Sequence, residues 1–75
     1  MKITQILYFD CTSIGKDSCY NGDCIGRVDY HNGLLIPSIG SMMRFQSGKY
    51  DGFYKVVSHI YFEEYELLRI NLEKV

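Results

Sequence analysis

The last third of the chain constrains the fold most, because apolar and aromatic residues recur with a period of two through residues 52–75. Such a period places successive side chains on opposite faces of a β-strand. β-Branched and aromatic residues, which suit a pleated surface, dominate the first half of the segment. One face of the predicted strand carries Tyr54, Val56, Ser58, Ile60 and Phe62, and the other carries Phe53, Lys55, Val57, His59 and Tyr61.

The second half of the segment repeats the pattern and predicts another strand. Leu68, Ile70 and Leu72 share the face that we expect to point inward. Glu63 and Glu64 then fall at the turn between the two strands. The positions expected at the solvent or the chain end are Glu66, Arg69, Asn71, Glu73 and Lys74.

A helix over residues 61–74 is the alternative. Glu and Leu are good helix formers, and apolar residues here also recur at the spacing of one helical face. That face comprises Tyr61, Tyr65, Leu68, Leu72 and Val75. The β-branched residues at 56, 57 and 60 favour the strand, because they extend it backward and would crowd the first turn of a helix.

The rest of the chain predicts further short strands joined by turns. We expect them at Met1–Phe9, Arg27–Ile36 and Ser41–Phe45. Seven glycines are spread along the chain, which fits many short strands with tight turns. We therefore predict a mostly β fold, a small antiparallel barrel or strongly curved sheet of about five strands. It forms a single domain over residues 1–75 with an irregular loop at 10–26, and an α+β fold with the C-terminal helix is the alternative.

The first predicted strand is apolar on both faces. Ile3, Leu7 and Phe9 share one face, whereas Ile6 and Tyr8 share the other. A strand of this kind is either covered on both faces or packed at an interface. We favour a barrel strand whose outer residues lie under the loop that follows. As an unpaired edge, the same strand could add to the sheet of a partner.

From Leu35 onward, apolar and turn residues follow a recurring arrangement. It reads Pro37-x-x-Gly40, a short strand to Phe45, Gly48, Tyr54-x-Val56-x-x-His59 and Leu68-x-Ile70-x-Leu72-x-Lys74-Val75. Over roughly the C-terminal 40 residues this resembles small bacterial and phage proteins with an SH3-like or partly open small β-barrel. The resemblance implies that the Tyr-x-Val strand pairs with the last strand. The loop at 10–26 lies outside the pattern, so the resemblance implies no function.

Charge and composition narrow the functional classes. The formal net charge is −1, whereas a general nucleic-acid binder shows a basic excess. No apolar run approaches the roughly 20 residues that span a bilayer, and Met1–Gln5 lacks the pattern of a signal peptide. An odd count of three cysteines suits a reducing compartment. We expect a cytoplasmic protein without a membrane partner, in the host cytoplasm if a phage encodes it.

Few residues could carry chemistry. The three cysteines and His31 have the spacing C-x7-C-x4-C-x6-H, which lacks the close ligand pairs of structural zinc sites. We predict no metal and no cofactor, and zinc at Cys11, Cys19 and Cys24 or a Cys19–Cys24 disulfide stays open as an alternative. The glutamates at 63, 64 and 66 are interpreted as solvated turn residues rather than paired catalytic carboxylates. The chain is therefore predicted not to be an enzyme.

Aromatic residues are the most informative functional feature. Tyrosine offers a large contact area at small entropic cost, which makes it frequent at interface hot spots. The predicted binding residues, at loops or on outward faces, are Tyr20, Tyr30, Tyr50, Phe53 and Tyr61. They favour a non-enzymatic protein-binding module whose partner is another protein or, in a homodimer, a second copy. A phage-encoded inhibitor of a host or defence protein is the specific form that we consider.

A small β-barrel that binds nucleic acid is the alternative. Its binding face would combine aromatic rings, on which bases stack, with nearby cations. The rings are Tyr50 and Tyr54, and the cations are Lys16, Arg27, Arg44, Lys49 and Lys55. The negative net charge disfavours this hypothesis.

Overall fold

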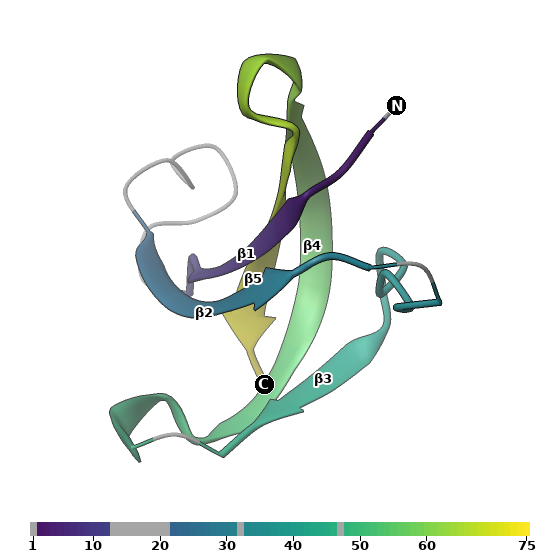
Figure 1. Ribbon diagram of the computed structural model, residues 1–75. Coiled ribbons are helices and arrows are strands. Elements are labelled where there is room, and N and C mark those ends of the chain that lie inside the picture. The colour runs from purple at the N-terminus through teal and green to yellow at the C-terminus, as the bar shows by residue number, and fades with distance from the viewer. Residues whose placement is uncertain (1, 13–21, 32, 47) are drawn as a thin grey trace.

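The computed structural model describes residues 2–12, 22–31, 33–46 and 48–75, and this part of the chain is mostly β-structure. The strands are β1 (Gln5–Asp10), β2 (Asp23–Asp29), β3 (Met42–Phe45), β4 (Gly52–Phe62) and β5 (Leu67–Lys74). The short 3-10 helices η2 (Gly48–Tyr50) and η3 (Glu63–Tyr65) flank β4. One sheet results, in the order β2-β1-β5-β4-β3, and Figure 1 shows it curled into a half-barrel. The predicted small, mostly β fold is confirmed.

β1 lies inside the sheet, between β2 and β5. It pairs antiparallel with β2 and parallel with β5, so the sheet is mixed and the predicted purely antiparallel arrangement is wrong. The prediction that the first strand could offer an unpaired edge is wrong, because both of its backbone edges are used. The outermost strands are β2 and β3, and these present the backbone groups that a partner strand could use.

The concave face of the sheet holds the core. Leu68, Ile70 and Leu72 of β5 point inward as predicted and are buried. They pack against the neighbouring strands β1 and β4. The buried core cluster comprises Ile6, Tyr8, Tyr54, Val56, Leu68, Ile70 and Leu72. Burial of this apolar area away from water is the main stabilising term for so small a domain.

Phe45 of β3 brings the two outermost strands toward each other across the core. Its ring meets Tyr8 and Tyr54 edge-on, at centroid separations of 5.6 and 5.5 Å. A side chain at Gly26 of β2 would place its Cβ 3.1 Å from the Phe45 ring. Glycine at this position therefore lets β2 approach the ring closely. The Phe45 ring fills the space between β2 and β3 in the half-barrel.

A β-bulge interrupts the pairing of β4 with β5. Val56 pairs with Leu72, but Ser58 pairs with Asn71, the next residue along β5. Val57 is therefore an extra residue on β4. Such a bulge shifts the alternation of the strand by one position and adds local bending.

The bulge reverses which side chains of β4 point inward beyond it. Paired residues of neighbouring strands share a face, so His59 and Tyr61 point inward with their partners on β5, whereas Ile60 and Phe62 point outward. The sequence alternation predicted the opposite faces for these four residues, because it continued the period of two through Val57. Tyr61 accordingly packs against the core cluster.

The second strand begins and ends earlier than the predicted Arg27–Ile36. β2 starts at Asp23, within the predicted loop at 10–26, of which residues 13–21 lie outside the described part. β2 ends at Asp29 because its partner β1 begins at Gln5, and the last bond runs from Tyr30 N to Thr4 O at 2.9 Å. The following residues 33–41 contain no strand, although Leu34 and Ile36 pack against the core.

The β4–β5 connection is a turn, as predicted from the adjacent glutamates. η3 covers Glu63–Tyr65, and Glu66 closes the turn in the left-handed conformation with φ of 50°. The alternative of a helix over 61–74 is wrong, because β5 extends from Leu67 to Lys74 in a continuous ladder with β4. The described residues hold no helix long and apolar enough to cross a membrane.

Candidate functional site

A shallow apolar groove of about 260 Å³ lies on the outer face of the sheet. We call it the outer groove, and its lining residues are Leu7, Phe9, Phe62, Tyr65, Leu67 and Arg69. Strands β1, β4 and β5 and the turn η3 each contribute to it. The outer groove therefore combines segments from both ends of the chain on one surface.

Three features of the chain build the outer groove. Leu7 and Phe9 alternate with the core residues of β1 and so point outward. The Val57 bulge turns Phe62 outward, next to its β5 partner Leu67. The η3 turn then carries Tyr65, whose side chain is 70% exposed, to the rim of the groove.

Arg69 forms the floor of the outer groove and is buried. Only 5% of the residue is exposed, and its guanidinium carbon lies 3.8 Å from the centroid of the Phe9 ring. Arg69 Nε also donates a hydrogen bond of 2.7 Å to Asn71 Oδ1. A stacked and hydrogen-bonded guanidinium of this kind is held in one orientation.

Asn71 connects the groove floor to the neighbouring strand. Its Nδ2 donates to Ser58 Oγ at 3.0 Å, and Cys11 Sγ lies 3.8 Å from its Oδ1. Asn71 is fully buried. The prediction that Arg69 and Asn71 lie at solvent positions is therefore wrong, because the outer face of β5 is covered as well as the inner face. A connected polar network of this kind makes a rigid floor.

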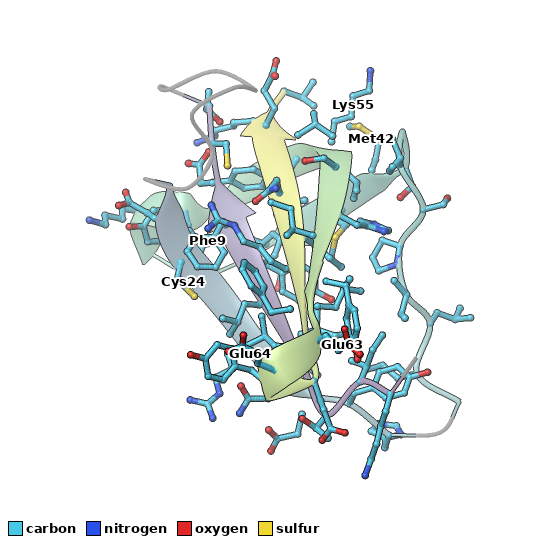
Figure 2. The ribbon with its side chains drawn as sticks, turned by 90° about the horizontal axis from the view of Figure 1, so that it is seen from above. Phe9, Cys24, Met42, Lys55, Glu63 and Glu64 are labelled. Atoms are coloured by element: carbon cyan, nitrogen blue, oxygen red, sulfur yellow. The ribbon has the colours of Figure 1, made fainter. Side chains whose placement is uncertain are left out.

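A second exposed surface lies on β3 and the start of β4. We call it the edge patch, and it comprises Met42, Arg44, Phe53 and Lys55. Cross-strand pairing places Met42 beside Lys55 and Arg44 beside Phe53. The Arg44 guanidinium lies 5.3 Å from the centroid of the Phe53 ring, which is a cation–π contact. Figure 2 shows Met42 and Lys55 at the opposite end of the molecule from Glu63 and Glu64.

The predicted binding residues do not form one surface. Phe53 is half-exposed in the edge patch. Tyr30 and Tyr61 are partly buried and pack against the core cluster. Tyr50 is half-buried in η2, where its hydroxyl lies 3.4 Å from Asp23 Oδ2 and Lys49 lies over its ring. The fifth residue, Tyr20, lies outside the described residues.

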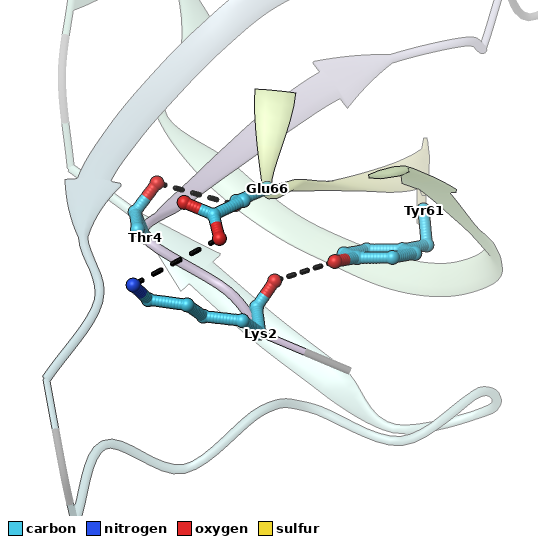
Figure 3. A network of polar contacts seen from close by, with 4 residues as sticks. All are labelled: Lys2, Thr4, Tyr61 and Glu66. Atoms are coloured by element: carbon cyan, nitrogen blue, oxygen red, sulfur yellow. Dashed lines mark hydrogen bonds and ion pairs between the residues drawn. The ribbon is translucent and has the colours of Figure 1, made fainter. Parts of the chain in front are cut away.

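Tyr61 anchors the N-terminal segment. Its hydroxyl donates a hydrogen bond of 2.6 Å to the backbone oxygen of Lys2 (Figure 3). Beside it, Lys2 Nζ lies 3.9 Å from the Glu66 carboxylate, and Thr4 N donates to Glu66 O at 2.7 Å. These contacts explain why the Tyr61 side chain is partly buried in the fold rather than available on a binding surface.

Sequence reasoning missed the residues of the outer groove, although one signal pointed to them. The apolar outer face of the first strand, with Leu7 and Phe9, indicated a strand covered on both sides. Phe62, Tyr65 and Leu67 gave no comparable signal, because the phase of Phe62 depends on the bulge and the other two flank a turn.

The cysteines do not form a site within the described residues. Cys11 is buried under the outer face, and Cys24 is exposed on β2, beside Phe9 in Figure 2. Cys19, which both the zinc and the disulfide alternatives require, lies outside the described part. Among the residues that the structure describes, no three His, Cys, Asp or Glu side chains converge to hold a metal ion.

Comparisons with known proteins do not indicate a function, so a function is inferred from the geometry of the site. No protein-family model, no curated protein and no solved structure matches the chain.

Proposed function

We propose that the protein is a non-enzymatic protein-binding module and that its partner docks on the outer groove. The observation that carries the proposal is an exposed aromatic rim above a buried, fixed floor. Tyr65 is largely exposed, while Arg69 beneath the groove is held by the Phe9 ring and by Asn71. Tyrosine is one of the residue types enriched among the hot spots that supply most of the binding energy at protein interfaces.

The size and rigidity of the outer groove support docking of a protein segment. A volume of about 260 Å³ holds one or two apolar side chains. Apart from Tyr65 on the η3 turn, its lining residues belong to strands of one sheet, so little ordering entropy is lost on binding. Inhibition of a host or defence protein would follow if the docked segment were one that the partner needs for its own activity. The origin in a phage rests on the sequence resemblance alone.

The test is a selection of random 12-residue peptides, displayed on a carrier, against the immobilised protein. We expect enriched peptides to bind wild type and to bind the Tyr65→Ala variant at least about tenfold more weakly, because a hot-spot aromatic side chain is lost. Phe53→Ala is the matched control, since it removes an exposed ring from the edge patch. No enrichment, or enrichment that depends on Phe53 instead of Tyr65, would overturn the proposal.

Nucleic-acid binding at the edge patch and η2 is the second candidate, because each holds a cation over an aromatic ring. Arg44 contacts Phe53, and Lys49 lies 5.1 Å from the centroid of the Tyr50 ring. Stacked bases and backbone phosphates could use such pairs. A labelled single-stranded 12-nucleotide probe tests this directly. Binding that falls steeply with salt and is lost in Arg44→Glu would favour it over the groove.

A further inference from the structure

We propose that the outer groove selects a partner segment in which a basic residue stands next to an apolar one. This inference rests on the proposed function and specifies the chemistry of the partner. Phe62 and Tyr65 line the outer groove and also a second, adjoining hollow. That second hollow is lined by Tyr61, Phe62, Glu63, Glu64 and Tyr65. An apolar site and an acidic site therefore share two aromatic side chains.

The two glutamates give the rim of the groove an uncompensated negative charge. Glu63 and Glu64 are exposed, and neither forms a salt bridge within the described part of the chain. Glu66 differs from them, because Lys2 lies 3.9 Å from its carboxylate. The rim thus offers two carboxylates that a partner cation could reach.

The other charges around the outer groove do not cancel those of the glutamates. Arg69 lines the outer groove and carries a positive charge beneath its floor, which offsets part of the glutamate charge there, but it does not line the acidic hollow. On β2, Arg27 and Asp29 both point outward and pair with β1, one cation and one carboxylate on the same strand face. The charges of Arg27 and Asp29 therefore cancel. Among the described residues bordering the groove, the exposed charges that remain are the negative charges of Glu63 and Glu64.

The neighbouring rings favour a cation at the same place. The exposed Tyr65 ring and the Phe62 ring both border the acidic hollow. A lysine or arginine side chain can contact such a ring face while its charge meets a carboxylate. An apolar side chain one or two positions away in the same segment would then enter the groove over Phe9 and Leu67.

The peptide selection distinguishes this inference from the proposed function by the composition of the peptides that it yields. We expect the peptides that depend on Tyr65 to be enriched in Lys or Arg within two positions of a Leu, Ile, Phe or Met. For a synthetic copy of one such peptide, Glu63→Gln combined with Glu64→Gln should weaken binding about fivefold at low salt. Glu73→Gln, on the outer face at the far end of β5, removes one carboxylate far from the groove rim and is the charge control; it should change binding less than about twofold.

Each other outcome has a definite meaning. Peptides that depend on Tyr65 but lack basic residues would overturn this inference and leave the proposed function standing. Basic peptides that bind Tyr65→Ala as well as wild type would overturn both. Light scattering tests whether a second copy of the chain occupies the groove. A wild-type dimer that Tyr65→Ala converts to monomer would show that a second copy occupies the groove, which also contradicts this inference.

Discussion

The two faces of β5 are both buried but are stabilised by different interactions. Inward, Leu68, Ile70 and Leu72 belong to the buried apolar core cluster. Outward, Arg69 and Asn71 are equally inaccessible, yet each is held by hydrogen bonds or a ring contact. The inner face depends on apolar contact area, whereas the outer face depends on polar groups keeping their partners.

The difference shows why burial alone does not identify a core. The inner face fills the half-barrel and determines the register, because a one-residue slip would expose its whole apolar set. The outer face leaves a groove above its polar floor, with Tyr65 exposed at the rim. One strand thus contributes the fold on one side and the candidate binding surface on the other.

The largest effect expected is on the inner face. Ile70→Ala should lower the free energy of unfolding by about 3–4 kcal/mol, because Ile70 is fully buried and the change leaves a cavity. Urea unfolding followed by circular dichroism measures this loss. If Ile70→Ala is unfolded, Ile70→Val gives the same test on a smaller scale, at about 1 kcal/mol. A cost below these values would mean that the core is less tightly packed than the contacts indicate.

On the outer face, Asn71→Ala should cost about 2–3 kcal/mol, because it removes the acceptor of Arg69 Nε and the donor to Ser58. Ser58→Ala is the control, since it removes one of these partners and should cost about 1 kcal/mol. Both are measured by chemical unfolding. Equal costs for the two variants would show that the bond to Arg69 contributes little, and the outer face would then resemble an ordinary surface.

A change of pH tests the inner face in a different way. Burial raises the pKa of Tyr54 above its ordinary value of 10.0, and the charges of Asp10, Tyr50 and Asp51 raise it further. Burial also raises the pKa of Tyr8. The unfolded chain therefore releases these protons at lower pH than the folded chain. Their contribution to stability is complete below about pH 10 and is lost as the pH rises through the folded values.

The measurement compares wild type with Tyr54→Phe between about pH 8 and pH 11. At the lower pH the variant should be about 1 kcal/mol less stable, because Tyr54 loses its 3.1 Å hydrogen bond to Tyr50 O. Above about pH 10 the gap should narrow, since phenylalanine has no proton to lose. A gap that stays constant would mean that Tyr54 titrates alike in the folded and unfolded chains.

The sequence predicted the inner face far better than the outer one, for physical reasons. Strict alternation identified Leu68, Ile70 and Leu72, because nothing interrupts β5. The same rule failed beyond Val57, because this extra residue has high β-propensity and changes the phase without a glycine or proline to mark it. It failed again at Arg69 and Asn71, since polar residues alternating with apolar ones normally indicate solvent. Their burial depends on residues of other segments, such as Phe9 and Ser58.

The smallest stability effect should come from the groove rim, and it separates binding from folding. Tyr65→Ala and Phe53→Ala should each change the free energy of unfolding by no more than about 0.5 kcal/mol, because both rings are at least half exposed. Only Tyr65→Ala should also weaken peptide binding, by at least about tenfold. A loss above about 1 kcal/mol in Tyr65→Ala would assign this ring to the packing of the outer face. The outer groove would then be part of the fold, and the edge patch would become the better candidate for the binding surface.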